Sequence, residues 1–329
     1  MPPLILLRSL LRSMPRVAVS RMRRGPARPT WSFRYELLAR TMRRTFDVIA
    51  ARPIPDLRAA FDAMANTRSP ALAKTTRTKI EPRGVPSEWF APRDDFSASG
   101  APVVLYLHGG GYVFGSTRTH AAIVARIALA ARARVLVPNY RLAPEHPYPA
   151  AVDDALAVYE WLLAEGVPAS RIVVGGDSAG GGLTMSLLLR LREAKRPLPA
   201  GAVLICPWVD HTATGGSADT NATFDYATID MADAWRAAYL PNGHDLRDPI
   251  LSPVYADLAG LPPLLVQVGA AELLHDQVNA LAARAKEHGV DVKLEVEPDM
   301  IHVWHSFADF IPECRRAIDA IGDFVRSKT

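Results

Sequence analysis

Short, uninterrupted runs of apolar residues recur through the body of this 329-residue chain. A run without apolar–polar alternation predicts a strand that is covered on both faces, as in a parallel sheet. Such runs lie at 103–107, 135–137, 172–174, 203–205 and 264–268, and a last strand-like segment lies at 292–296. Before the first run, the segments KIEP and EWFAP predict a hairpin.

Helical spacing of apolar residues fills most of the intervals between these strands. Four intervals predict helices, at 120–133, 150–165, 181–193 and 276–288. Repeated alternation of strand and helix is typical of a doubly wound sheet with right-handed crossovers. The predicted fold class is therefore α/β, with a mostly parallel sheet.

Two segments interrupt this alternation. Residues 31–65 have helical spacing that is broken at Pro53 and Pro55, and residues 207–262 are too long for a simple crossover. Insertions in α/β sheets usually lie over the carboxyl ends of the strands, where ligands bind. We therefore expect one domain over 31–329, with a helical cap formed by about 31–70 and 207–250.

The first 30 residues differ from the rest in charge. Residues 1–44 contain eleven arginines and one acid, Glu36, whereas the remaining 27 basic and 33 acidic residues give the body about −6. A basic stripe for nucleic acid is therefore not expected on the body. The apolar patch near the start is broken by Arg8 and Arg12, too short for a signal peptide, and no run reaches the roughly 18 residues of a membrane span. We expect a cytoplasmic protein with a flexible extension at 1–30, and contact of that extension with a membrane surface as the alternative.

Cysteine usage indicates no metal site. Cys206 and Cys314 lie in apolar surroundings, with no CxxC pattern and no Cys/His clustering. Reduced core thiols are the expectation, and neither a metal nor an organic cofactor is predicted.

One serine lies among small residues in the stretch Gly176-Asp177-Ser178-Ala179-Gly180, directly after the strand at 172–174. G-x-S-x-G between a strand and a helix is typical of a nucleophile elbow, whose tight turn leaves no space for side chains at the flanking glycines. The amides at the start of the following helix point toward the serine oxygen. Ser178 is therefore the candidate nucleophile, and the Ala179 amide is a candidate oxyanion donor.

A second glycine-rich motif, His108-Gly109-Gly110-Gly111, ends the strand at 103–107. Consecutive glycines let the backbone approach a substrate with its N–H groups turned inward, as an oxyanion hole requires. The phosphate-loop pattern G-x-x-x-x-G-K-[ST] is absent, which disfavours nucleotide binding. The amides of Gly109 and Gly110 are the predicted donors.

These motifs together resemble a known family. HGGGY, NYRLAPE at 139–145, GDSAGG and MIHVW at 300–304 resemble the bacterial hormone-sensitive-lipase-like branch of the α/β hydrolases. The resemblance covers about residues 85–325, and the helices from about 31 are similar to that family's cap. It implies an α/β-hydrolase fold and an order of serine, then acid, then histidine. It is also compatible with a homodimer.

The resemblance implies the two partners of Ser178. His302 stands where the family's histidine stands, and His305 is its rival. Glu272 occupies the position at which many members carry the first acid of D-P-L-x-D. Asp276 is the alternative acid, although its position also suits a first-turn carboxylate at a helix start.

The implied activity is that of a serine carboxylesterase (EC 3.1.1.-) acting on short- to medium-chain acyl esters through an acyl-enzyme. The alternatives are a lactone hydrolase, an acetyl-ester or amide deacetylase and, in another class, a non-catalytic small-molecule binding protein on the same fold. Aromatic side chains that could line the acyl pocket, or equally pack in the core, are Tyr112, Phe114, Trp208 and Tyr226.

Overall fold

The computed structural model describes residues 2–65, 67–93, 100–212, 216–241 and 243–329. Within these ranges an eight-stranded sheet has the order β1-β2-β4-β3-β5-β6-β7-β8. The pairs β1–β2 and β2–β4 are antiparallel, and the other neighbours are parallel. The strands are β1 (Thr75–Ile80), β2 (Ser87–Pro92), β3 (Val103–Leu107), β4 (Arg134–Pro138), β5 (Ile172–Asp177), β6 (Gly201–Ile205), β7 (Leu264–Gly269) and β8 (Val292–Glu297). The predicted α/β class and its mostly parallel sheet are confirmed.

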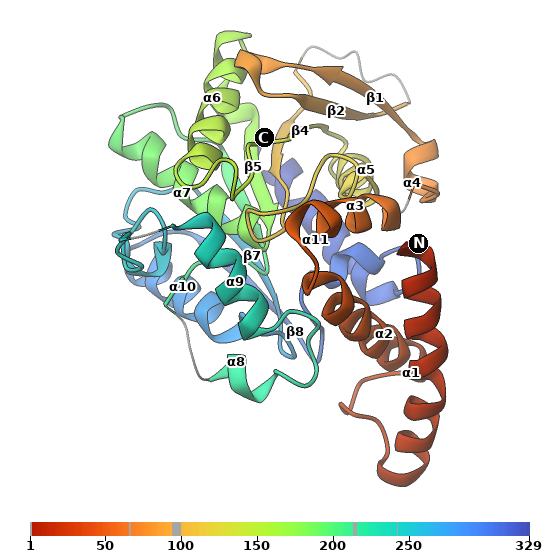
Figure 1. Cartoon of the computed structure of the whole chain (residues 1–329). Coiled ribbons are helices and arrows are strands. Elements are labelled where there is room, and N and C mark those ends of the chain that lie inside the picture. The colour runs from red at the N-terminus through yellow and green to blue at the C-terminus, as the bar shows by residue number, and fades with distance from the viewer. Residues whose placement is uncertain (1, 66, 94–99, 213–215, 242) are drawn as a thin grey trace.

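Helices cover both faces of this sheet (Figure 1). α5 (Ala121–Ala131) packs against α11 (Pro312–Lys328) on one face, and α6 (Ala150–Ala164) packs against α7 (Ala179–Glu193) on the other. α10 (His275–Glu287) joins β7 to β8. Every residue of β3, β5, β6 and β7 is buried, which explains why these strands are apolar without alternation.

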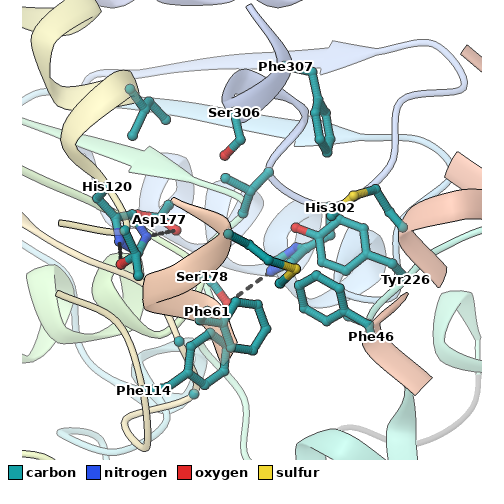
Figure 2. A pocket seen from close by; sticks show the side chains of 18 of the residues that line it. Phe46, Phe61, Phe114, His120, Asp177, Ser178, Tyr226, His302, Ser306 and Phe307 are labelled. Carbon is teal, nitrogen blue, oxygen red and sulfur yellow. Dashed lines mark hydrogen bonds and ion pairs between the residues drawn. The ribbon is translucent and has the colours of Figure 1, made fainter. Parts of the chain in front are cut away.

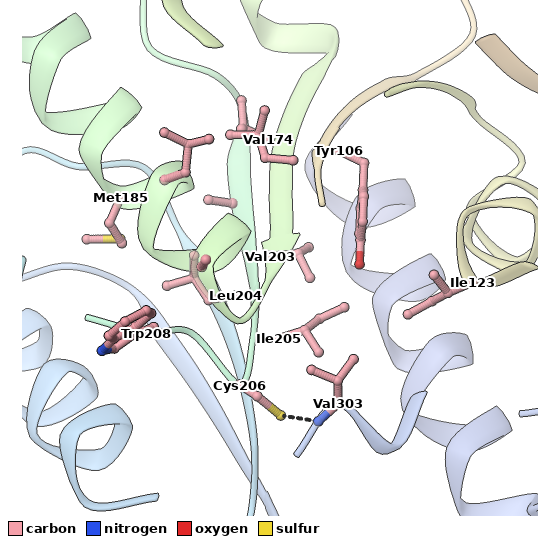
Figure 3. Packing of buried hydrophobic residues seen from close by; sticks show 14 of the residues in the cluster. Tyr106, Ile123, Val174, Met185, Val203, Leu204, Ile205, Cys206, Trp208 and Val303 are labelled. Atoms are coloured by element: carbon pink, nitrogen blue, oxygen red, sulfur yellow. Dashed lines mark hydrogen bonds between the residues drawn. The ribbon is translucent and has the colours of Figure 1, made fainter. Parts of the chain in front are cut away.

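The core lies between the strands and these helices. Met185 of α7 lies on one side of the central strands and Ile123 of α5 on the other, with Val203 and Ile205 of β6 between them (Figure 3). Cys206, at the end of β6, is a free buried thiol, and so is Cys314. The Sγ of Cys206 accepts a hydrogen bond from the amide of Val303 at 3.3 Å.

The two segments outside the alternation form separate helices beside the carboxyl ends of the parallel strands (Figure 1). The first contains α2 (Phe33–Ala50) and α3 (Ile54–Met64), and Pro53 and Pro55 mark the break between them. The second contains α8 (Ser217–Thr220) and α9 (Ile229–Tyr239). Short elements elsewhere are α4 (Pro70–Ala73), η1 (Pro82–Gly84), η2 (Ala169–Arg171), η3 (Pro253–Tyr255) and η4 (Trp304–Phe307).

The N-terminal segment is a helix, α1 (Pro2–Arg24), where the sequence predicted a flexible extension. Its small buried residues Ser9, Ser13 and Val17 recur every four positions along the side that packs on α2. Arg21 binds Glu36 of α2 at 2.7 Å. The partner surface is supplied by a later segment, so the pattern within residues 1–30 could not reveal it. None of the helices in the described ranges is both long and apolar enough to cross a membrane.

Candidate active site

Ser178 lies at the junction of β5 and α7 in a strained backbone conformation, with φ +53° and ψ −122°. Few residues with a side chain adopt a positive φ, and such residues often occur at functional sites. A methyl group built on Gly176 would lie 2.5 Å from the carbonyl oxygen of Gly180, and one built on Gly180 would lie 2.6 Å from that of His108. The flanking glycines are therefore required by close packing, as expected for an elbow.

Loops that follow the last two strands bring a histidine and an acid to this serine. The Nε2 of His302 lies 2.9 Å from the Oγ of Ser178 (Figure 2). The Nδ1 of the same ring lies 3.3 Å from Oε2 of Glu272. Glu272 is fully buried and His302 nearly so. The three side chains form the chain of contacts through which a base activates a serine hydroxyl and an acid orients that base.

The rival residues make other contacts. Asp276 accepts the amide of Ser217 through Oδ2 at 2.8 Å and contacts His275 through Oδ1 at 3.0 Å, in the first turn of α10. The Nε2 of His305 lies 2.8 Å from Oε1 of Gln267 in the core. Burial lowers the pKa of His305 to about 3, so its ring stays neutral. The structure thus brings Glu272 and His302 to the serine, and not Asp276 or His305.

The environment of His302 favours its protonated form. Burial lowers its pKa, but the hydrogen bond and charge of Glu272 raise it, with further help from the charges of Asp225 and Asp177. The net direction is upward from the ordinary value. A base of raised pKa takes a proton more readily, and its protonated form is stabilised by the buried carboxylate.

The sequence predicts that the Gly109 amide donates to the oxyanion, but in the structure this amide is bonded to a side chain. It donates a hydrogen bond to Oδ1 of Asp177 at 3.1 Å, and the hydroxyl of Tyr106 donates to the same oxygen at 2.7 Å. Burial raises the pKa of Asp177, but the charge and hydrogen bond of His120 lower it, and the net result is a pKa of about 2. The carboxylate that accepts these hydrogen bonds is therefore ionised. The Gly109 amide is therefore engaged, whereas Gly110 and Gly111 line the cavity beside Ser178.

The serine faces a cavity of about 800 Å³. Phe61 and Phe114 stack with ring centres 4.1 Å apart, and the ring centres of Phe46 and Tyr226 are 4.4 Å apart (Figure 2). Trp208 also lines the cavity. Further apolar lining residues come from the N-terminal helices and from the segment after β8, namely Leu6, Leu38, Met42, Met64, Phe307 and Phe310.

Tyr112 is a correction to the predicted pocket. Phe114, Trp208 and Tyr226 line the cavity as predicted, but Tyr112 is not among its lining residues. Its ring stacks on that of Tyr239 at 3.8 Å and is 2% exposed. A residue next to the glycine motif can point to either side of the loop, and here packing on α9 decides the direction.

Sequence reasoning missed Asp225, a buried carboxylate in the segment between β6 and β7. Its Oδ1 accepts the amides of Tyr226 at 2.8 Å and His302 at 3.1 Å, and its Oδ2 accepts that of Leu273 at 2.8 Å. Burial raises the pKa of Asp225 to about 6. Its one signal in the sequence is an acid within the apolar stretch TFDYATI, which does not reveal which loops approach it.

Comparisons with known proteins show the family of this chain. A family model described as "alpha/beta hydrolase fold" matches residues 104–306. An acetyl-hydrolase of Streptomyces hygroscopicus is 46% identical over 246 residues, covering 74% of this chain and 80% of the relative. The crystal structure of an esterase from the bacterial hormone-sensitive lipase family has a TM-score of 0.80 at 45% identity, covering 88% of this chain and 97% of the other. The chain belongs to the hormone-sensitive lipase family of the α/β hydrolases.

This membership confirms the family predicted from the HGGG and GDSAGG motifs. Another relative is an esterase of Acinetobacter venetianus. It is 35% identical over 231 residues, which cover 70% of this chain and 76% of the relative. A crystal structure of a mutant of the esterase E40 has a TM-score of 0.81 at 46% identity and covers 87% of this chain and 95% of the other.

The site also holds the one compact group of potential metal ligands found among the described residues, formed by Cys206, Glu272 and His302. Their ligand atoms lie within 4.8 Å of one another. However, the Nδ1 of His302 already faces Glu272. A cation bound there would separate the two groups, and the arrangement fits a hydrogen-bonded pair better than a metal centre.

Proposed function

We propose that this protein is a serine carboxylesterase that hydrolyses short- to medium-chain acyl esters. The observation that carries the proposal is the contact of Ser178 Oγ with His302 Nε2 at 2.9 Å, backed by Glu272 and facing an apolar cavity. The relatives named esterase and acetyl-hydrolase support it. Small esters are the substrates that such relatives imply.

In the proposed reaction Ser178 attacks the ester carbonyl and His302 takes its proton, while Glu272 stabilises the imidazolium. The amides of Gly110, Gly111 and Ala179 would bind the oxyanion. Gly111 replaces Gly109 here because the Gly109 amide is bonded to Asp177. His302 then donates its proton to the departing alcohol and activates water, which releases the acid from Ser178.

A second candidate function is the hydrolysis of acetyl esters in particular. It is favoured by the name of the Streptomyces hygroscopicus relative, which is 46% identical. The triad serves either activity, so the distinction depends on the acyl pocket. Initial rates with p-nitrophenyl acetate, butyrate and octanoate, a caprolactone and an N-acetyl amide separate the candidates. Activity confined to acetate would favour the narrower function, and a preference for the lactone would exclude both.

The experiment that tests the enzyme class is labelling with a fluorophosphonate probe. We expect the wild-type protein to be labelled and the Ser178→Ala variant to be unlabelled and at least about 10⁴-fold less active. His275→Ala, a histidine outside the site, is the control and should be labelled normally. A folded wild-type protein that is neither labelled nor active would instead support a binding protein on this fold.

A further inference from the structure

The exposed side of α1 carries a continuous apolar stripe. Leu4, Leu7, Leu11, Met14 and Met22 have exposed fractions of 53%, 48%, 56%, 47% and 78%. Their spacing of three or four residues, with Ala18 between the last two, places them along one side of the helix. This side is opposite the one that packs on α2. Five large apolar side chains in one exposed line form a surface of the kind that marks an interaction site.

A row of exposed arginines borders this stripe along one edge. Arg8, Arg12 and Arg16 follow that edge at intervals of four residues and are exposed. The whole of α1 contains six arginines and no aspartate or glutamate. A helix of this kind, apolar on one side and basic beside it, matches the interface of an anionic bilayer, where apolar side chains enter the acyl region and arginines meet the headgroups.

The other edge of the stripe leads to the cavity. Leu10 and Leu6 lie along it with exposed fractions of 37% and 39%, and Leu6 also lines the cavity that Ser178 faces. Phe310, 72% exposed, lines the same cavity from the segment before α11. Apolar surface thus continues from the stripe to the entrance of the site.

From these observations we propose that α1 docks the protein on an anionic lipid surface, with the cavity opening toward the lipid. A second copy of the chain is a less suitable occupant, because two such helices would bring twelve arginines together without an acid, a number that follows from six on each. The docking surface stands independently of the esterase activity. That apolar esters enter from the lipid phase rests on the proposed function.

The test is co-sedimentation of the full-length protein with vesicles, without substrate. We expect binding to vesicles of phosphatidylcholine with about a third phosphatidylglycerol and at least tenfold weaker binding to phosphatidylcholine alone, since several arginines contribute. Binding should fall as sodium chloride is raised, because the charges are exposed. Equal binding to both vesicle types, or none to either, would overturn the proposal.

Substitutions test whether the stripe itself, rather than nonspecific adsorption of the protein, is responsible for vesicle binding. Leu7→Ser with Leu11→Ser, and Arg8→Gln with Arg12→Gln, should each lower binding about tenfold or more. Val48→Ser, on α2 with a 48% exposed side chain outside the stripe, is the matched control and should bind normally. All variants should keep the wild-type melting temperature and rate with p-nitrophenyl acetate, so failure to dock is distinct from failure as an esterase. Loss of a dimer in sedimentation velocity, without loss of vesicle binding, would assign the stripe to a second copy and overturn the proposal.

Discussion

At the scale of single residues, the site depends on carboxylates whose neighbours decide their roles. Glu272 and Asp276 are four positions apart, yet only Glu272 reaches His302. Glu272 lies in the loop after β7 and is fully buried, whereas the Asp276 side chain is 60% exposed in the first turn of α10. A buried acid facing a ring nitrogen can orient that ring and stabilise its charge, which a solvated acid at a helix start does not do.

Replacement of Glu272 should therefore be far more damaging than replacement of Asp276. We expect Glu272→Gln to lower kcat by about 10³- to 10⁴-fold, because the imidazolium loses its partner. Asp276→Asn, the matched control, should change kcat by less than about threefold. Steady-state kinetics with p-nitrophenyl butyrate measures both. A larger loss in Asp276→Asn would reverse the assignment of the acid.

The pH dependence of the rate should also show the influence of Glu272 on His302. The base must be neutral to accept a proton, so kcat/KM falls as the pH drops through the pKa of His302, which is raised in this site. Burial alone lowers the pKa, and Glu272 is the main raising influence. The acid limb of the Glu272→Gln profile should therefore lie at lower pH than that of the wild type. A limb that stays in place would show that another group controls the titration.

At the scale of elements, Asp225 connects the segment between β6 and β7 to the two loops that carry Glu272 and His302. Its carboxylate accepts the amide of His302, after β8, and the amide of Leu273, next to Glu272. Three buried N–H groups share this one side chain. Because a buried N–H without an acceptor is costly, the three groups hold the two loops in one relative position.

Asp225→Asn tests this positioning role. Its amide group cannot accept all three N–H groups, so we expect kcat to fall by about 10- to 100-fold through misplacement of His302. The loss of a negative charge that raises the His302 pKa should also move the acid limb of kcat/KM to lower pH. Asp219→Asn, an exposed acid of the same segment, is the control and should behave as wild type. A lowered melting temperature with unchanged kcat and pH profile would indicate a structural role alone.

At the scale of the whole molecule, the cavity is assembled from distant parts of the chain. The N-terminal helices contribute Leu38, Met42 and Phe46, and the β6–β7 segment contributes Tyr226 and Trp235. Ser178, Glu272 and His302 come from the loops at the carboxyl ends of β5, β7 and β8. The cavity has a volume of about 800 Å³, which is within the range of sites that enclose a small molecule. The helices outside the sheet thus form much of the cavity wall.

Filling the part of the cavity wall on α2 should shift substrate choice. We expect Met42→Trp to lower kcat/KM for p-nitrophenyl octanoate at least about tenfold relative to acetate, because a bulky ring takes space that the longer chain needs. Val48→Trp, on α2 but outside the cavity lining, is the control. An equal loss for both esters would place the acyl chain elsewhere.

The sequence by itself determined the strands of the parallel sheet and the glycine-flanked turn at Ser178, because these follow from local patterns. Apolar runs and tight glycine turns are properties of contiguous residues. The candidate histidine, His302, came instead from the resemblance of the motifs to a known family. The tertiary structure alone decided that α1 packs as a helix, that the Gly109 amide is held by Asp177, that Tyr112 stacks on Tyr239 and that Asp225 joins two loops. Each of these depends on a partner from a distant segment, and spacing along the chain carries no information about which distant segments meet.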